Sequence, residues 1–299
     1  MLLKTITIAG SDTLGAEISW YIAFHGYTVT LYDRSDIGLE IGKVLHDKFA
    51  TIFIEKYQYK ESKIEETFKR INYTSNLDEA VHDCDLFIEN TPEKMENKIQ
   101  LFKDVSQYAS PKTIIASNSD SFLPSSLATH YKYPQQFIGA HFTNLIWENS
   151  LVEIMGHPDS DLLVVESMID FVKSIDILPI VLQKENSGYV LNSLLIPMLS
   201  SALTMFQKGI ATFEDIDRSW MSIGNKYGPF IIMDGVGLDT VYNIEKYLGE
   251  KDNDAQRISN ANFIHDEYIK KGKLGIISGE GFYKYPNPTH SRESFLKVL

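Results

Sequence analysis

The sequence has a single cysteine, Cys84, among its 299 residues. One cysteine cannot form an internal disulfide, which fits a reducing compartment, and we therefore expect a cytoplasmic protein. Cys84 stands at the start of an apolar run, in HDCDLFIE. Small apolar surroundings of this kind predict a buried residue rather than a nucleophile.

Long apolar runs are also missing. None approaches the roughly 18 residues that a membrane-spanning helix needs. The first residues, MLLKTITIAG, contain too short an apolar run for a signal peptide and lack its small-residue cleavage site, so they favour a first strand. The sequence therefore predicts no membrane partner.

Basic residues are scarce relative to acidic ones, with 28 Lys and Arg against 40 Asp and Glu and a formal net charge of -12. Binding to nucleic acid through a basic surface is excluded by this balance, because phosphate neutralisation needs clustered Lys and Arg. The 43% of hydrophobic residues is nevertheless enough for real cores, and the length suits two domains.

Strand-like and helix-like segments alternate over the first two-thirds of the chain. This alternation indicates a mostly parallel, doubly wound α/β sheet. The predicted strands are 3–9, 27–33, 85–89, 113–117, 137–142, 150–155 and 177–182, and the predicted helices are 16–25, 37–69, 93–108 and 161–174.

After about residue 185 the pattern becomes helical. We expect a long apolar helix within 188–209, bent by Pro197, then a helix capped by Thr212 with Asp215, and further helices over 239–248 and 254–271. Because this first helix of the second domain is so apolar, we expect it to be buried within that domain and partly in a homodimer interface. The predicted domains are 1–184, binding a nucleotide, and 185–299, all-helical.

A dinucleotide-binding turn is predicted between the first strand and the first helix, at Gly10-Ser-Asp-Thr-Leu-Gly15. The usual pattern is G-x-G-x-x-G, whose helix N-terminus holds the pyrophosphate. Asp33 closes the second strand, where a carboxylate binds the adenosine ribose and favours NAD, while Arg34 keeps NADP open. The predicted cofactor-binding residues of this turn and strand are Gly10, Asp12, Thr13, Leu14, Gly15 and Asp33.

Asp12 departs from that pattern, because it holds the position of the second glycine. A carboxylate about 5 Å from a phosphate costs on the order of 3 kcal/mol at an effective dielectric near 20. We therefore predict that Asp12→Gly tightens NAD binding. An ordinary strand-turn-helix junction without a nucleotide is the alternative.

The segment FIGAHFTNLIWENSLVEIM carries the most chemical information. His141 ends one predicted strand and Glu153 lies inside the next. Ligands of doubly wound sheets collect beyond the carboxyl ends of strands. A histidine there, backed by a buried carboxylate, is a general base with a fixed tautomer.

This segment resembles the HF-x-N…VE signature of the 3-hydroxyacyl-CoA dehydrogenases. Its variant HFTNLIWENS looks like that of their short bacterial 3-hydroxybutyryl-CoA dehydrogenase group. The resemblance covers nearly the whole chain. Besides the first turn it includes DLFIENTPEKMENK (85–98), ASNSDS (116–121), GYVLNSLLIP (188–197), YGPFIIMDGVGLDT (227–240) and GKLGIISGEGFYKYP (272–286).

The resemblance implies an NAD-dependent Rossmann enzyme without a metal, acting on a small acyl-CoA. It implies that His141 takes the proton of the 3-hydroxyl, that Glu153 orients His141, and that Asn192 bonds near the substrate oxygen. Asn118 and Ser119 would line the nicotinamide site, and Glu93 and Lys98 would contact the nicotinamide half of the cofactor. For the last pair, an ordinary exposed helix pair is the alternative.

Asp120 is a second departure, because the family usually has Ser at this catalytic position. An ionised Asp accepts hydrogen bonds but cannot donate them, and it would favour the protonated imidazolium of His141. We expect this to impair oxidation more than reduction.

The substrate is less firmly implied than the chemistry. CoA phosphates need basic groups, for which 37–69 offers Lys43, Lys48, Lys56, Lys60 and Lys63 among many acids. Two alternatives remain: a dehydrogenase of a free hydroxy acid of the sugar-acid or carnitine type, and a ligand-binding member with weakened catalysis. Acyl chain length, direction and oligomeric state are left open.

Overall fold

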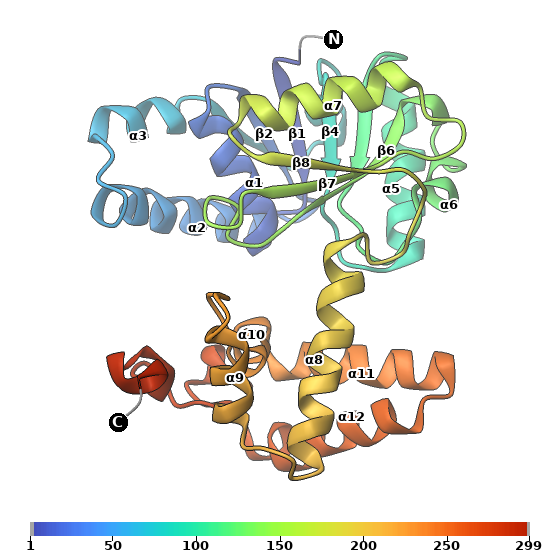
Figure 1. Ribbon diagram of the computed structural model, residues 1–299. Helices are drawn as coiled ribbons and strands as arrows, with labels where there is room; N and C mark the ends of the chain where they lie inside the picture. Colours follow the sequence, from blue (N-terminus) through green and yellow to red (C-terminus); the bar gives the residue numbers. More distant parts are fainter. Residues whose placement is uncertain (1–2, 298–299) are drawn as a thin grey trace. The chain divides into compact units, whose positions relative to one another are not determined.

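The structure, a computed structural model, describes residues 3–297 (Figure 1). The chain divides into two units, at Val190 and Leu191. The boundary predicted from composition lies at residue 184, a few residues before this division.

The first unit is built on one eight-stranded sheet. Its strands are β1 Thr5–Ala9, β2 Thr28–Tyr32, β3 Ile71–Thr74, β4 Leu86–Glu89, β5 Ile114–Ser117, β6 Phe137–Phe142, β7 Leu151–Met155 and β8 Leu178–Leu182, in the order β3-β2-β1-β4-β5-β6-β7-β8. Strands β1 to β6 are parallel, while β7 runs antiparallel to β6 and parallel to β8. The predicted mostly parallel sheet is confirmed.

Helices cover both faces of this sheet. Side chains of β4 show why, since Leu86 and Ile88 belong to one buried cluster and Phe87 to the other. The first cluster includes residues of α1 (Thr13–Phe24), α2 (Asp36–Glu55), α3 (Glu61–Phe68) and α7 (Leu162–Ser174). The second includes residues of α4 (Leu77–Val81), α5 (Met95–Tyr108) and α6 (Pro124–Ala128). This is a doubly wound fold.

One local prediction was wrong in this unit, and two elements were missed. The helix expected over 37–69 is interrupted between α2 and α3, where Gln58 has a φ of 59°. Strand β3 and helix α4 were not predicted, because β3 is a short edge strand with only Ile71 buried and lacks a clear apolar alternation. Neither change alters the order of the central strands.

The order of the strands places a crevice for ligands. From β1 the chain adds β2 and β3 on one side of the sheet, and then crosses to add β4 and the later strands on the other side of β1. In open α/β sheets, ligands bind beyond the carboxyl ends of the strands at this switch point. The residues that follow β1, β4, β5 and β6 are therefore expected to line this crevice.

Five helices make up most of the second unit: α8 Leu191–Gln207, α9 Phe213–Met221, α10 Pro229–Val236, α11 Leu238–Asp252 and α12 Ala255–Glu267 (Figure 1). The predicted cap of α9 is confirmed, since the Thr212 hydroxyl accepts the Asp215 N–H at 3.1 Å. Pro197 lies inside α8. Leu194 in its first half is 70% exposed, and the buried α8 residues all come from its second half, so the expected cover in a dimer stays a prediction.

Buried carboxylates hold the C-terminal segment of this unit. Asp234 accepts the Phe282 N–H at 2.8 Å and the Tyr283 N–H at 2.9 Å. Asp217 accepts the Phe230 N–H and the Tyr283 hydroxyl, both at 2.8 Å. The GFYKYP segment is thereby fixed on α9 and α10, which explains its place among the motifs.

The structure also bears on two predictions made from absences. Cys84 is buried, and burial raises the pKa of its thiol to about 12, so it cannot serve as a thiolate nucleophile. Among residues 3–297, the helices are all too short or too polar to cross a bilayer.

Candidate functional site

The turn after β1 requires glycine at two positions. Gly10 has a φ of +113°, and a Cβ there would lie 2.2 Å from the Asn90 carbonyl oxygen. A Cβ on Gly15 would lie 1.9 Å from the Gly10 carbonyl oxygen. The chain therefore turns as tightly as a dinucleotide-binding turn does, and the alternative of an ordinary junction needs no such approach.

Asp12 is the N-cap of α1, a role that the sequence analysis did not foresee. Its Oδ1 accepts the Gly15 N–H at 3.0 Å, and its φ of -66° is one that any residue adopts. In the described part of the chain, the N–H groups of Thr13 and Leu14 find no acceptor. Two amides at a helix N-terminus are thus available to an anion.

Asp33, at the end of β2, is held in place by the same turn. Its Oδ2 accepts the Ser11 N–H at 3.1 Å and the Ser11 hydroxyl at 2.7 Å, and its Oδ1 accepts the Ser35 N–H at 2.9 Å. Arg34 instead pairs with Asp104 at 3.3 Å. A carboxylate without a partnering arginine suits a ribose hydroxyl and repels a 2′-phosphate.

Glu93 and Lys98 form an ion pair in which Lys98 is buried, whereas the Glu93 side chain remains 36% exposed. Lys98 is 1% exposed, and its Nζ lies 2.7 Å from Glu89 and 3.1 Å from Glu93. Burial raises the pKa of Glu93, but Lys98 and the hydroxyls of Ser119 and Ser121 lower it more, so the pKa is below its usual value. The burial of Lys98 argues against an ordinary exposed helix pair, and contact of this pair with the cofactor stays a prediction.

Glu89 was missed in the sequence analysis. It ends β4, is fully buried, and accepts the Ser117 hydroxyl at 2.6 Å in addition to Lys98. Its signal was its position, at the carboxyl end of a central strand. A buried carboxylate there supports the cation of Lys98.

His141 and Glu153 are cross-strand partners on β6 and β7. The antiparallel register places them directly opposite each other on one face of the sheet. The His141 Nδ1 lies 3.0 Å from the Glu153 Oε2, and the other Glu153 oxygen accepts the Val190 N–H at 2.9 Å. The predicted pair is therefore within hydrogen-bond reach.

This pairing decides how the imidazole can act. Glu153 is 1% exposed, whereas the His141 side chain retains 12% exposure. A carboxylate only accepts, so the Nδ1 carries the proton and the Nε2 is the atom that accepts one. This geometry fixes the tautomer of His141 and leaves the Nε2 as its accepting nitrogen.

Tyr189 was also missed, although it lies in the GYVLN motif. Its ring stacks on the His141 imidazole with centroids 5.1 Å apart and planes at 27°. A Cβ on Gly139 would lie 2.3 Å from the Tyr189 hydroxyl oxygen. Tyr189 thus limits the movement of the imidazole, and Gly139 makes room for it.

The predicted residues after β5 lie between these groups. Asn118 accepts the Phe142 N–H at 2.6 Å and donates to Asn90 at 2.8 Å, while the Ser119 hydroxyl donates to Glu93. Asn118 is therefore bonded to the residue next to His141 in the sequence.

Asp120 retains an exposed surface, but the protein around it raises the pKa of its carboxyl above the usual value. The negative charge of Glu93 raises it further, and His141 lowers it. Asp120 is thus close enough to Glu93 and His141 for their charges to affect its pKa. Asn192 lies on α8, in the other unit.

These residues fit NAD. The turn, the free amides of Thr13 and Leu14, and Asp33 supply the contacts that a pyrophosphate and a ribose need. The crevice further contains an imidazole whose free nitrogen can take or give a proton.

Comparison with known proteins identifies the family. The family model described as "3-hydroxyacyl-CoA dehydrogenase, NAD binding domain" matches residues 5–186, and its "C-terminal domain" counterpart matches residues 188–285. The two matches meet within a few residues of the division between the two units.

Individual relatives agree. The chain is 33% identical to the mitochondrial hydroxyacyl-coenzyme A dehydrogenase of Sus scrofa, over 95% of this chain and 92% of the relative. It is 30% identical to a probable 3-hydroxybutyryl-CoA dehydrogenase of Bacillus subtilis, over 97% and 100%. A solved diketoreductase matches with a TM-score of 0.89 and 36% identity, over 95% and 100%. The chain therefore belongs to the 3-hydroxyacyl-CoA dehydrogenase family, with NAD as its cofactor.

Proposed function

We propose that this protein catalyses the NAD-dependent interconversion of a short 3-hydroxyacyl-CoA, of the 3-hydroxybutyryl-CoA type, and its 3-keto form. The observation that carries the proposal is the hydrogen bond from the His141 Nδ1 to the buried Glu153, 3.0 Å long. It leaves one imidazole nitrogen for the substrate hydroxyl.

In the oxidation direction the His141 Nε2 accepts the proton of the 3-hydroxyl. Bound NAD supplies the acceptor for the hydride that leaves C3. Glu153 stabilises the imidazolium that forms, and Tyr189 keeps the ring in place. In the reverse direction the same nitrogen returns the proton to the carbonyl oxygen. General acid–base catalysis of this kind contributes about 10²- to 10⁴-fold to the rate.

The remaining site residues are proposed to bind the cofactor. The amides of Thr13 and Leu14 donate to the pyrophosphate, and Asp33 accepts from the adenosine ribose. Glu93, Lys98, Asn118 and Ser119 bind the nicotinamide half. Their support is that β4 and β5 end beside each other and that Glu93 is bonded both to the buried Lys98 and to the Ser119 hydroxyl. Gly10 and Gly15 keep the turn closed.

Asp120 takes the place of a hydroxyl donor in this proposal. A protonated carboxyl can donate to the substrate oxygen, and its raised pKa keeps the protonated form present to a higher pH. Activity of the wild type should decline at a lower pH than activity of Asp120→Ser. Superimposable pH–rate profiles of the two proteins would reject this role.

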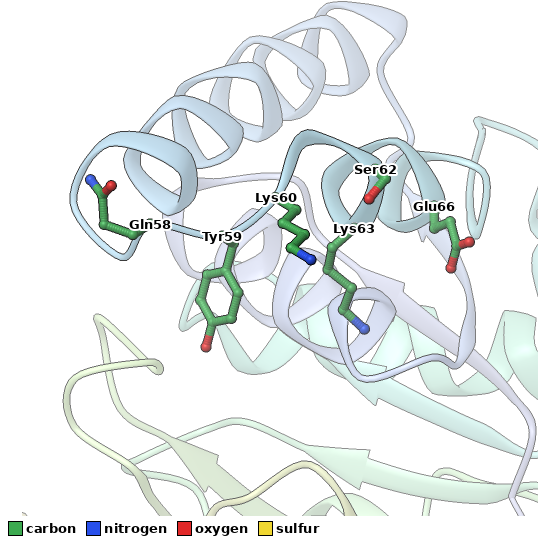
Figure 2. A pocket seen from close by; sticks show the side chains of 6 residues that line it. All are labelled: Gln58, Tyr59, Lys60, Ser62, Lys63 and Glu66. Carbon is green, nitrogen blue, oxygen red and sulfur yellow. The ribbon is translucent and has the colours of Figure 1, made fainter.

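The CoA portion has a candidate site at the turn between α2 and α3. Lys43 and Lys56 are paired with Glu40 and Glu148, at 2.6 and 2.5 Å. Lys60 and Lys63, by contrast, line a hollow with Gln58, Tyr59, Ser62 and Glu66, and Figure 2 shows Tyr59, Lys60 and Lys63 extending to the same side of the turn. Two cations beside an aromatic ring suit a phosphate and an adenine.

A second candidate function is the reduction of a dicarbonyl compound without CoA, which the likeness to the solved diketoreductase favours. One experiment separates the two. NADH consumption is followed with acetoacetyl-CoA, with free acetoacetate and with an acetoacetate ester. Preference for the thioester, lost in Lys60→Ala/Lys63→Ala, supports the first function. Equal rates with the ester and the thioester favour the second, and no consumption with any of them contradicts both.

A further inference from the structure

A chain of four hydrogen bonds connects the nucleotide-binding turn to β6, the strand of His141. The Phe142 N–H donates to Asn118 at 2.6 Å, and the Asn118 amide donates to Asn90 at 2.8 Å. The Asn90 amide donates to the Asp12 Oδ1 at 2.8 Å, and that oxygen also accepts the Gly15 N–H at 3.0 Å. From Phe142 to Asp12, each residue of this hydrogen-bond chain donates to the next, and Asp12 accepts at its end.

Asn90 occupies the middle of this hydrogen-bond chain and is fixed there by its backbone. It is 7% exposed and follows β4 directly. Its N–H donates to the Ala9 carbonyl at 2.8 Å, and its own carbonyl oxygen lies against Gly10. Both ends of its side-chain amide are therefore committed, one to Asn118 and one to Asp12.

This hydrogen-bond chain bears on the repulsion expected between the Asp12 carboxylate and the phosphates of NAD. The second position of a dinucleotide turn is where the backbone approaches the pyrophosphate. A carboxylate about 5 Å from a phosphate, at an effective dielectric near 20, would weaken binding about a hundredfold. Here one carboxylate oxygen receives two N–H donors at once. Donors of this kind draw the negative charge onto the helix end, and a polarised chain behind them strengthens the effect.

We propose that Asn90 is a positioning residue that holds the Asp12 carboxylate on the Gly15 amide and so makes an acidic turn compatible with the pyrophosphate of NAD. The same amide connects the turn, through Asn118, to the backbone beside His141. This inference deepens the proposed function and rests on it only through the binding of NAD. It also replaces the simple expectation that Asp12→Gly tightens binding, because the repulsion is already offset in the wild type.

A double-mutant cycle tests the proposal. The dissociation constant of NADH is measured by calorimetry for the wild type, Asn90→Ala, Asp12→Gly and the double variant. Asn90→Ala should weaken NADH about tenfold, which corresponds to about 1.4 kcal/mol. Asp12→Gly should stay within about threefold of the wild type, and in its background Asn90→Ala should change affinity less than about twofold.

Two controls separate positioning from general damage. The loss in Asn90→Ala should shrink at high salt and be absent for adenosine, which has no phosphate. Asn260→Ala, the same change at a buried asparagine of the helical unit, should lower the melting temperature without altering NADH affinity. Equal weakening by Asn90→Ala with and without Asp12, or equal weakening for adenosine, overturns the proposal.

Unfolding of the ligand-free protein gives an independent readout. The same cycle should show coupling of Asn90 and Asp12 of about fivefold or more in the unfolding equilibrium constant. Absence of coupling means that the bond is not formed and overturns the proposal, even if all variants bind NADH. A wild type that shows this coupling but does not bind NADH contradicts the cofactor assignment instead.

Discussion

Glu153 is the residue on which the acid–base role of His141 depends. It is enclosed by β6, β7 and the segment before α8, and it accepts hydrogen bonds from His141 and from the Val190 N–H. A buried carboxylate is costly unless it interacts with a cation, and the imidazolium formed during the reaction is such a cation. Its charge, more than its shape, is therefore expected to matter.

Replacing that charge should slow the reaction without removing the cofactor. For Glu153→Gln we expect kcat to fall roughly a hundredfold, because the amide stabilises no imidazolium, while the dissociation constant of NADH is unchanged. Steady-state rates and calorimetry measure the two quantities. Glu245→Gln, the same change at a buried glutamate of the helical unit, is the matched control and should leave kcat unaltered. Similar kcat values for both variants would argue against the role of Glu153.

Glu17 is a second buried carboxylate, on the first turns of α1. It is 2% exposed and accepts the Leu145 N–H at 2.6 Å, in the loop that follows β6. Burial raises the pKa of Glu17 to about 7, Asp12 raises it slightly, and hydrogen bonds from Leu145 and Ile146 oppose the rise. The folded protein therefore holds this proton more tightly than the unfolded chain.

From this shift the pH dependence of stability follows. The contribution of Glu17 is fully present below its unfolded pKa of 4.5 and is lost as the pH rises through about 7. Glu17→Gln should therefore stabilise the protein near pH 8 by on the order of 3 kcal/mol and have much less effect near pH 5. Urea unfolding at the two pH values measures the difference. An effect of equal size at both would contradict the raised pKa.

At the scale of elements, the β1–α1 turn brings together requirements from three strands. Gly10 must approach the end of β4, Gly15 must approach Gly10, and Asp33, which follows β2, accepts a hydrogen bond from Ser11. The turn is thus shaped by neighbours far apart in the sequence. Such a turn tolerates a Cβ poorly, because the obstacle is backbone and cannot rotate away.

Gly10→Ala tests this element against a matched glycine. The Cβ would lie 2.2 Å from the Asn90 carbonyl oxygen, so the turn must open, and we expect NADH binding to weaken more than about tenfold. Gly26 has a similar φ of +100° but no atom within 4 Å of its Cβ position. Gly26→Ala should cost about 1 kcal/mol of stability and leave NADH affinity unchanged. Equal affinities of the two variants, measured by calorimetry, would mean that the close approach is unimportant.

The same elements show which parts of the fold can be predicted from sequence. Strands β1, β4, β5, β6 and β7 have strong apolar patterns and were predicted within two residues of their bounds. The break between α2 and α3 was not, because a turn at Gln58 with a positive φ has no glycine to mark it. Local patterns identify what is buried, and they do not identify where an exposed helix stops.

The site divides along the same line. The proximity of His141 and Glu153 could be predicted, because one ends a strand and the other lies inside the next. Asn118 and the Glu93–Lys98 pair were implied by the resemblance to the family, and their roles stay predictions. The roles of Asn90 and Tyr189 could not be predicted, since each depends on a contact with a residue distant in sequence. Asp12 was predicted as a repulsive charge, and only its hydrogen bonds show that it caps a helix.

At the scale of the whole molecule, the helical unit exposes several large apolar side chains. Leu194, Ile223 and Ile277 are 70%, 74% and 85% exposed. We predict that this unit associates with a second copy, because exposed apolar area of this kind favours self-association. Sedimentation velocity should give the mass of a dimer, which Ile223→Glu/Ile277→Glu reduces to the 34.0 kDa of one chain. A concentration-independent monomer for the wild type would refute the prediction.

The central claim is that the imidazole of His141 moves the substrate proton while a bound dinucleotide exchanges hydride. The most direct test is NADH consumption with acetoacetyl-CoA by the wild type, His141→Asn and His82→Asn, the last being a change at an exposed histidine. The account predicts consumption by the wild type and by His82→Asn, and a loss of roughly a thousandfold in His141→Asn with NADH binding retained. Undiminished consumption by His141→Asn would contradict it.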